Sequence, residues 1–300
     1  MCSLQSNKFK IIANVITLQK KRVIIIDRKI MKNVAFIGAG NMNGAIISGL
    51  VQNGYPAENI IVSNPSAEKR LALQESLGIK QTQSNIEAVQ FADVIVLGVK
   101  PYLISDVCQH LSENIDLTGK SFISVAAGTT LAQIEQALAQ PCSVFRTMPN
   151  TPSQIGEGVT GIFANTKATD DEKAFTETLM TSVGIVKWLE TEEQIDHIIA
   201  VSGSAPAYFF LFMEAMEKQA RAYGFNEKDS RELVQQTALG AAKMVIENQQ
   251  PISKLRENVT SKGGTTQAAI SAFSEGGLEQ LVTKAMNTAL DRAKEMAQNS

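Results

Sequence analysis

The sequence predicts an α/β fold, in which a doubly wound parallel sheet of the Rossmann type is followed by an all-helical C-terminal region. From residue 33 onward, short β-branched runs alternate with stretches of helical composition, the pattern of βαβ units with right-handed crossovers. A glycine-rich turn directly follows the first run, and strand patterns cease after residue 190. We therefore expect a sheet domain over residues 31–190 and a helical domain over residues 191–300.

The predicted strands are short, and each of the first four precedes a helical stretch, as a parallel sheet requires. Thr169, followed by three acidic residues, predicts the start of a further helix, because a hydroxyl cap and negative charge both stabilise that end. In the C-terminal region, breaks between helices are expected near Gly224, Pro251 and Gly276–Gly277. The expected strands are VAFI (34–37), IIV (60–62), VIVL (94–97), SFISV (121–125), SVFRTM (143–148), VTGIFA (159–164) and GIVKWLE (184–190).

Composition and charge exclude several classes of protein. The chain has 300 residues, 44% of them hydrophobic, and a formal net charge of −2, so it offers no basic face to nucleic acid. The longest uncharged apolar run, AYFFLFM (207–213), is far shorter than the ~18 residues of a membrane span, so we expect no membrane segment. Three cysteines without C-x-x-C spacing and two histidines argue against a disulfide framework or a metal site, and free thiols fit a reducing cytoplasm.

The first thirty residues resemble neither an export signal nor a clean transit sequence. KKRVIIIDRK has basic flanks, but its hydrophobic centre is shorter than the apolar region of an export signal. Met31 lies immediately before the first predicted strand. We therefore expect residues 1–30 to be a dispensable extension.

The stretch PAYFFLFMEAMEKQARAY (206–223) predicts a helix whose first half is apolar on nearly all sides. A helical region of this size cannot easily enclose such a helix by itself. Burial against a second subunit is the simpler expectation, with Met213 and Met216 as core or interface residues. This region therefore predicts a homodimer or a larger homo-oligomer.

The segment GAGNMNGAIISGL (38–50) follows the first predicted strand. Gly38 permits a tight turn, Gly40 lets the backbone approach a pyrophosphate, and a helix beginning near Asn41 directs unpaired N–H groups at phosphates. Asn43 stands where the dinucleotide fingerprint has its third glycine. Because the turn lies between a buried strand and an amphipathic helix in a βαβ series, it predicts a dinucleotide site.

The end of the second predicted strand favours NADP(H), with NAD(H) as the alternative. NAD sites place an acidic residue there, which would repel a 2′-phosphate. Here the strand continues into SNPSAEKR (63–70), which offers neutral hydrogen-bonding side chains and, one helical turn on, Lys69 or Arg70. The same Ser-Asn-Pro-Ser sequence could also be a turn that caps the next helix.

Two further segments follow predicted strands, GVKP (98–101) and AAGTT (126–130). Open α/β sheets bind ligands beyond the carboxyl ends of their strands, near the point where strand order reverses. Both segments, and Lys100 in particular, are therefore candidates for the cofactor site.

Taken together, these signals resemble the pyrroline-5-carboxylate reductase family over essentially all of residues 31–300. Six blocks carry the resemblance, in order and at appropriate separations: FIGAGNM (36–42), VKP (99–101), SVAAGTT (124–130), RTMPNTP (146–152), VSGSAPAYFF (201–210) and VTSKGGTT (259–266). The resemblance implies reduction of Δ1-pyrroline-5-carboxylate to L-proline, the last step of proline biosynthesis, by hydride transfer from NAD(P)H. It also implies a homodimer or a larger ring such as a decamer.

The resemblance further implies residue roles. The VTSKGGTT loop would hold the substrate carboxylate, with Ser261 on that carboxylate and Thr266 on the ring nitrogen as the catalytic residues. The expected substrate site comprises Ser261, Gly263, Gly264, Thr265, Thr266 and Ser204. The expected cofactor site, from the turn, the strand ends and the resemblance together, comprises Ile37, Gly38, Ala39, Gly40, Asn41, Met42, Ser63, Asn64, Asn85, Val99, Lys100, Pro101, Ala126, Ala127, Gly128 and Asn258.

Besides Asn43, which departs from the dinucleotide fingerprint, the sequence departs from the family pattern at three positions. The family usually has proline at Lys262 and often glycine or serine at Ala205, and some members have an acid at Gln249. Two other interpretations stay open. A β-hydroxyacid dehydrogenase combines similar domains, but it uses a lysine in the helix that follows SGSAP, where this chain has none before Lys218. A non-catalytic NADP(H)-binding protein would retain the fold without turnover.

Overall fold

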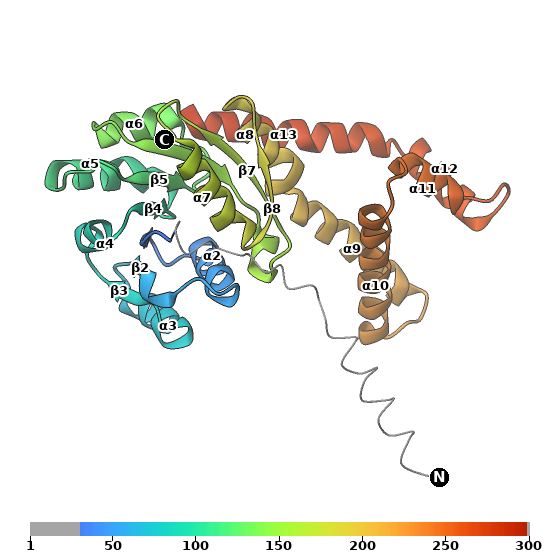
Figure 1. Cartoon of the computed structure of the whole chain (residues 1–300). Coiled ribbons are helices and arrows are strands. Elements are labelled where there is room, and N and C mark those ends of the chain that lie inside the picture. The colour runs from blue at the N-terminus through green and yellow to red at the C-terminus, as the bar shows by residue number, and fades with distance from the viewer. Residues whose placement is uncertain (1–30, 299–300) are drawn as a thin grey trace, which may run out of the picture. The chain divides into compact units, whose positions relative to one another are not determined.

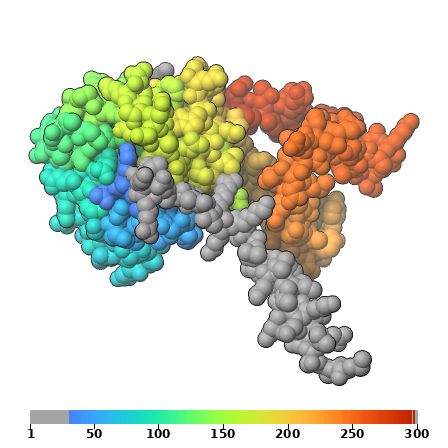
Figure 2. Space-filling view, viewed as in Figure 1, coloured from blue at the N-terminus to red at the C-terminus, as the bar shows by residue number. Residues whose placement is uncertain are grey.

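A computed structural model of the chain describes residues 31–298, so the expected extension over residues 1–30 lies outside the described part. The described part of the chain divides into two compact units, the first ending at Ile195 and the second beginning at Asp196. Figure 2 shows the atoms of the first unit, coloured blue to yellow-green, packed into one continuous mass.

The first unit is built on an eight-stranded sheet with the order β3-β2-β1-β4-β5-β6-β7-β8 (Figure 1). The strand order reverses between β1 and β4, which pair in parallel with each other, and this is the switch point of the sheet. On one side of it β2 pairs with β1, and on the other side β5 pairs with β4. The strands are β1 (Val34–Ile37), β2 (Ile60–Ser63), β3 (Lys80–Thr82), β4 (Val94–Leu97), β5 (Ser121–Ser124), β6 (Ser143–Met148), β7 (Gly158–Ala164) and β8 (Gly184–Trp188).

Every expected run forms a strand, and the sheet differs from expectation in two places. Sequence analysis missed β3, because its three residues are largely polar and lie at the sheet edge. The pair β6–β7 is antiparallel in an otherwise parallel sheet. Only a short segment containing the 3₁₀ turn η4 (Thr151–Ile155) joins these two strands, and it is too short for a parallel crossover.

Helices cover both faces of the sheet. Successive residues of β1 point to opposite faces, Val34 and Phe36 into one core cluster and Ala35 and Ile37 into the other. The first cluster includes side chains of α2 (Asn41–Gln52) and α7 (Asp170–Thr181). The second includes side chains of α4 (Asn85–Phe91), α5 (Ile104–Asn114) and α6 (Leu131–Leu138). A helix α3 (Ala67–Leu77) follows β2. Both cores are completed within the unit.

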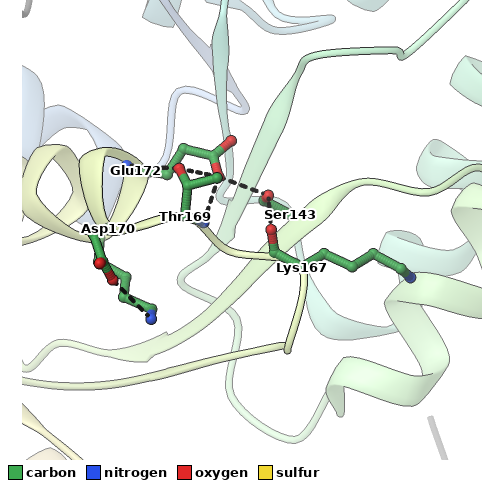
Figure 3. Close-up of polar contacts among 6 residues, drawn as sticks. Ser143, Lys167, Thr169, Asp170 and Glu172 are labelled. Atoms are coloured by element: carbon green, nitrogen blue, oxygen red, sulfur yellow. Dashed lines mark hydrogen bonds and ion pairs between the residues drawn. The ribbon is translucent and has the colours of Figure 1, made fainter.

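Glu172 joins the start of α7 to the amino ends of β5 and β6, and Figure 3 shows its contacts with Thr169 and with Ser143 of β6. Thr169 caps the helix as expected, in a capping box with Glu172. Glu172 also accepts hydrogen bonds from Ser121 Oγ at 2.6 Å and Ser143 Oγ at 2.8 Å. Burial opposes its negative charge, but these hydrogen bonds and those of Thr169 outweigh burial and lower the pKa of Glu172. The carboxylate is therefore a structural group at the edge opposite the strand carboxyl ends.

The second unit consists of helices. Its breaks fall at the expected positions, after Ala222, around Pro251 and at Gly276–Gly277. A π-helical segment, η5 (Ile199–Gly203), joins α8 to α9 without interrupting the helix. The helices are α8 (Glu193–Ile198), which spans the boundary between the units, α9 (Ala205–Ala222), α10 (Glu227–Glu247), α11 (Ile252–Asn258), α12 (Thr265–Glu275) and α13 (Leu278–Gln298).

Large apolar side chains of this helical unit are exposed in the single chain. Phe209 is 68% exposed, Phe210 62% and Leu211 68%, although all three belong to the apolar half of α9. The buried hydrophobic residues of the unit are few and small, among them Ala200, Val234 and Ala293. The sequence predicts burial of α9, and one chain does not provide it.

Within the described residues, one helix is long and apolar enough to cross a membrane by length and composition alone, the continuous run Glu193–Ala222. The AYFFLFM run by itself predicts no membrane segment. The helix is longer than that run because η5 keeps the backbone helical through the serine and glycine residues that precede Pro206.

Candidate functional site

The first part of the candidate site is the turn between β1 and α2. Gly38 has a φ of +99°, and its N–H donates to the Ser63 carbonyl oxygen at 2.8 Å, which ties the turn to the end of β2. A Cβ at Gly38 would lie 2.8 Å from the Gly98 carbonyl oxygen, whereas at Gly40 the nearest atom would be 3.8 Å away. Gly40 caps α2 without a side chain, and the first turn contains no acid. The first N–H groups of α2 are therefore available to the phosphates of a dinucleotide.

Asn43 is an integral part of this turn. Its side chain is 1% exposed, and Nδ2 donates to the carbonyl oxygens of Gly38 at 2.7 Å and Ile37 at 3.3 Å. A Cβ at Gly98 would overlap the Asn43 amide, so the glycine after β4 provides the space that this side chain fills. In the dinucleotide fingerprint, a third glycine at this position gives room for close packing of the helix on the strand. Here Gly98, which follows the neighbouring strand β4, gives the room instead.

The end of β2 carries neutral polar groups and one cation. Asn64 Oδ1 accepts the Ala39 N–H at 3.1 Å, which joins this strand end to the first turn. Arg70 Nε donates to the Asn64 carbonyl oxygen at 3.3 Å, and its Nη1 donates to Gln81 Oε1 at 3.0 Å. The guanidinium group is therefore held beside the strand end where an NADP site needs positive charge.

Ser63 and Asn85 form a pair at the same strand end. Ser63 is fully buried, and its hydroxyl donates to Asn85 Oδ1 at 2.6 Å. Asn85 is the first residue of α4 and is half-buried. Ser63 thus orients Asn85, and Asn85 is the member of the pair with surface to offer a ligand. Ser66 is the N-cap residue of α3 but makes no side-chain cap, so the capping interpretation of this turn is not fulfilled.

The remaining expected cofactor residues of the first unit follow β4 and β5, at the carboxyl edge of the sheet. Lys100 is exposed, and Thr129 is 2% exposed with no hydrogen-bond partner for its hydroxyl among the described residues. The turns after β1, β2, β4 and β5 meet at one sheet edge around the switch point, as a ligand site of an open α/β sheet requires. The residues that belong here are Val99, Lys100, Pro101, Ala126, Ala127 and Gly128.

The glycine pair of the Ser261–Thr266 loop shapes the N-terminus of α12. Gly263 has a φ of +73°, and the Gly264 N–H donates to the Ser261 carbonyl oxygen at 3.0 Å. A Cβ at Gly264 would lie 2.5 Å from the Ser261 hydroxyl. Gly264 caps α12 without a side chain, and the first turn has no acid. The N–H groups of Thr265 and Thr266, together with exposed hydroxyls, can therefore receive a carboxylate.

Gln267 is a contributor to this loop that sequence analysis missed. Its Oε1 accepts the Gly263 N–H at 2.6 Å, so the side chain folds back over the helix start and fixes the turn. The available signal was a glutamine at the third position of the helix, the place where capping boxes have Glu or Gln.

The other two residues expected in the site also lie in the second unit, Asn258 directly before that loop and Ser204 away from it. Ser204 directly follows η5, which contacts α13 and leads into α9. Figure 1 shows α12 beyond the right-hand end of α13, away from the start of α9. Asn258 ends α11, and its Nδ2 donates to Gln250 Oε1 at 3.2 Å. One chain therefore does not bring Ser204 and Thr266 together.

Two sequence profiles match the chain. One is described as pyrroline-5-carboxylate reductase dimerisation and matches residues 192–296. The other is described as NADP oxidoreductase, coenzyme F420-dependent, and matches residues 33–128. A pyrroline-5-carboxylate reductase from Vibrio alginolyticus is 53% identical over 266 residues, which are 88% of this chain and 97% of that protein. The chain belongs to the pyrroline-5-carboxylate reductase family.

Solved structures of this family have the same fold. The pyrroline-5-carboxylate reductase from Coxiella burnetii is 43% identical, with a TM-score of 0.84 over 89% of this chain and 98% of that one. The Plasmodium falciparum enzyme, solved with NADP bound, is 27% identical, with a TM-score of 0.80 over 89% of this chain and 98% of that one. The family is one of NAD(P)H-dependent oxidoreductases, and the dimerisation profile covers the helices whose apolar faces are exposed here.

Lys218 argues against the dehydrogenase alternative. It is exposed on α9 and pairs with Glu214 one helical turn earlier at 2.8 Å. The hydrogen bond and the charge of Glu214 raise the pKa of Lys218, which keeps the amine protonated instead of poising it as a base. No group of three metal-ligating side chains occurs in the part of the chain that the structure describes.

Proposed function

We propose that the protein reduces Δ1-pyrroline-5-carboxylate to L-proline with NADPH as its preferred reductant. The observation that carries the proposal is that two helices of the chain begin at a glycine N-cap, so that no side chain occupies their first N–H groups. One is α2, after the β1–α2 turn, and the other is α12, which begins within the Ser261–Thr266 loop. The first suits the pyrophosphate of a dinucleotide, and the second suits a small carboxylate. Membership of the reductase family gives the chemistry that links them.

The loop residues bind and orient the imine. The N–H groups at the start of α12 and the Ser261 hydroxyl hold the carboxylate without a fixed cation. In this proposal the Thr266 hydroxyl hydrogen-bonds the ring nitrogen, whose proton enters with the substrate as the iminium ion. The contribution of a bound reduced nicotinamide is a hydride for the imine carbon. Catalysis then depends on the residues that hold the imine carbon about 3–3.5 Å from the nicotinamide carbon that gives the hydride.

The preference for NADPH over NADH is supported by the end of β2. No carboxylate follows this strand directly, and Arg70 is held at the strand end through Asn64 and Gln81. A 2′-phosphate would gain a cation and an amide partner there, whereas a 2′-hydroxyl would lack the acidic acceptor that NAD sites provide.

We propose that the protein works as a homodimer or as a larger ring of dimers such as a decamer, and that it acts in the cytoplasm. The apolar half of α9 supports the assembly, because its large side chains are exposed in one chain. The separation of Ser204 from Thr266 supports it as well, since both serve one substrate only if a second copy takes part. The free thiols Cys108 and Cys142 fit a reducing compartment.

The test is an initial-rate assay with the imine and each nicotinamide, on the wild-type protein and on Thr266→Ala. We expect turnover with NADPH, slower turnover with NADH, and a fall in kcat of at least about tenfold in the variant with little change in NADPH affinity.

Thr283→Ala on α13 is the matched control, because that hydroxyl donates to the Glu279 carbonyl oxygen within its own helix and should be dispensable. Tight NADPH binding by the wild-type protein without oxidation when the imine is supplied would instead identify a non-catalytic binding protein. Unchanged turnover in Thr266→Ala would remove that residue from the mechanism.

A further inference from the structure

Arg146 is a large buried cation for which the proposed chemistry has no use so far. It lies in the middle of β6, within the RTMPNTP block, and its side chain is 2% exposed. Its Nη1 donates to Glu192 Oε1 at 3.1 Å. The Glu192 side chain is 29% exposed, so the arginine alone is fully buried. Because removing a charge from water costs desolvation energy, replacement of such a pair by apolar residues is often neutral or stabilising. Stability alone is therefore a weak reason for this pair to be here.

Glu192 makes a second contact, which ties the ion pair to the start of α6. Its Oε1 accepts the Leu131 N–H at 2.8 Å, and Leu131 is the first residue of α6. This N–H is one of the groups that a helix leaves without an internal acceptor, and a carboxylate there is also favoured by the helix dipole. Thr130 and Gln133 cap the same helix start with a capping box.

The two residues of the pair lie at opposite ends of one loop, Arg146 beside its start and Glu192 at its end. Arg146 lies opposite Ser124, the last residue of β5, in the parallel register of β5 and β6. The loop 125–130 begins after Ser124, contains the AAGTT segment and ends at Leu131, where Glu192 binds. Thr147 adds a further tie at the loop start, because its hydroxyl donates to the Ser124 carbonyl oxygen at 2.8 Å.

The loop lies on the nicotinamide side of the switch point. The 2′-phosphate side of a dinucleotide is at the end of β2, so the other half of the molecule extends across β1 toward β4 and β5. Hydride transfer is sensitive to displacements of the order of 1 Å in such positions.

We propose that Arg146 and Glu192 are positioning residues for the nicotinamide half of the cofactor, acting through the loop 125–130. The ion pair holds the loop start and the loop end at a fixed separation. It also fixes residue 192, which lies between β8 and the first helix of the second unit. The proposal rests on the proposed function in so far as that function places the nicotinamide at this loop.

The experiment measures kcat, the Kd of NADPH and the Kd of adenosine 2′,5′-bisphosphate for wild type, Glu192→Ala and Glu192→Gln. The bisphosphate carries only the adenosine half, so its binding reports the β2 side alone. We expect Glu192→Ala to lower kcat at least tenfold and to weaken NADPH severalfold, while the bisphosphate Kd stays within twofold. Glu192→Gln keeps an acceptor for the Leu131 N–H and should recover part of kcat.

Glu135→Ala is the matched control, because it removes an ion pair from the same helix, with Lys167 at 2.9 Å, away from the loop. The double variant Arg146→Met, Glu192→Leu separates positioning from stability. We expect its melting temperature to return toward wild type while kcat stays low. If kcat returns together with the melting temperature, or if Glu192→Ala matches Glu135→Ala in all three measurements, the proposal is overturned.

The comparison of the two Kd values does not require imine turnover. Failure of the proposed function is therefore seen as a wild-type protein without turnover, whereas failure of this inference is seen as NADPH and bisphosphate affinities that change together.

Discussion

The two units of this chain bury their apolar residues in different ways. In the nucleotide-binding unit, the four residues of β1 and the four of β4 are at most 1% exposed, and helices from the same chain cover both faces of the sheet. In the helical unit, the first half of α9 presents phenylalanine and leucine side chains that are more than 60% exposed. The first unit thus contains its own core, and the second contains part of a core that a partner completes.

This difference predicts that cofactor binding depends on contacts within one chain, whereas the site on the second unit depends on assembly. The dinucleotide turn depends on contacts inside one unit, such as those of Gly38, Asn43 and Gly98. The Ser261–Thr266 loop, the proposed substrate site, belongs to the unit whose packing is incomplete in one chain. Substitutions in the first unit should therefore act on cofactor binding directly, and substitutions on α9 should act on assembly first.

The largest effect is expected from Phe210→Glu on α9. A glutamate at this position would bury a charge in the interface between subunits, which should cost at least about 2 kcal/mol, or roughly 30-fold in the dissociation constant. Sedimentation velocity should show monomers at concentrations where the wild-type protein is assembled, and the activity should fall with the assembly.

Leu71→Glu on α3 is the control for that change. Leu71 is 39% exposed in the nucleotide-binding unit, so a charge there should leave assembly and activity unaltered. Equal sedimentation of the Phe210→Glu variant and the wild-type protein would show that this face of α9 is not an interface.

A smaller effect is expected from Gly98→Ala in the nucleotide-binding unit. The new Cβ would overlap the Asn43 amide, and such overpacking typically costs about 1–3 kcal/mol. Because Asn43 holds the Gly38 carbonyl oxygen, NADPH affinity should fall as well, which calorimetric titration would measure.

Gly44→Ala, one residue beyond Asn43, is the matched comparison. Its Cβ would meet only Leu73 at an ordinary 3.9 Å, and it lies inside α2, where alanine should stabilise by about 0.5–1 kcal/mol. If Gly98→Ala melts and binds NADPH as the wild-type protein does, the contact between Asn43 and Gly98 does not organise the turn.

The smallest effect is expected from Glu172→Gln, through pH. The pKa of Glu172 is lower in the folded protein than its ordinary value of 4.5, so its contribution to stability is present above that value. The contribution is lost as the pH falls through the lower folded pKa. The substitution should destabilise the first unit by about 1 kcal/mol at pH 7 and less at acidic pH, measured by urea unfolding across that range. A pH-independent difference would contradict the role of the charge.

Much of this fold could be predicted because its signals are local. The β-branched runs from Val34 to Trp188, the Thr169 cap and the glycine breaks each depend on neighbouring residues, and the structure confirms them. The strand Lys80–Thr82 could not be predicted, because three largely polar residues form a strand only through pairing with β2. The antiparallel direction of β7, by contrast, follows from the short connection to β6, which leaves no room for a parallel crossover.

In the candidate site, too, contiguous segments could be predicted and contacts between distant residues could not. The glycine turn and the Ser261–Thr266 loop are contiguous segments, and the motifs indicate them directly. The contacts of Asn43 with the β1–α2 turn, of Arg70 with Gln81, and of Arg146 with Glu192 join residues that only the folded sheet brings together. Sequence patterns carry no signal for such pairs.

Hydrogen exchange of the wild-type protein, followed by mass spectrometry, tests most directly whether the helical unit is completed by a partner. A helix with one exposed apolar face in an isolated chain should open readily, whereas a helix in a closed interface should be protected. We expect the amides of Phe209–Phe212 to exchange as slowly as those of β1. Fast exchange in α9 beside slow exchange in β1 would contradict the account.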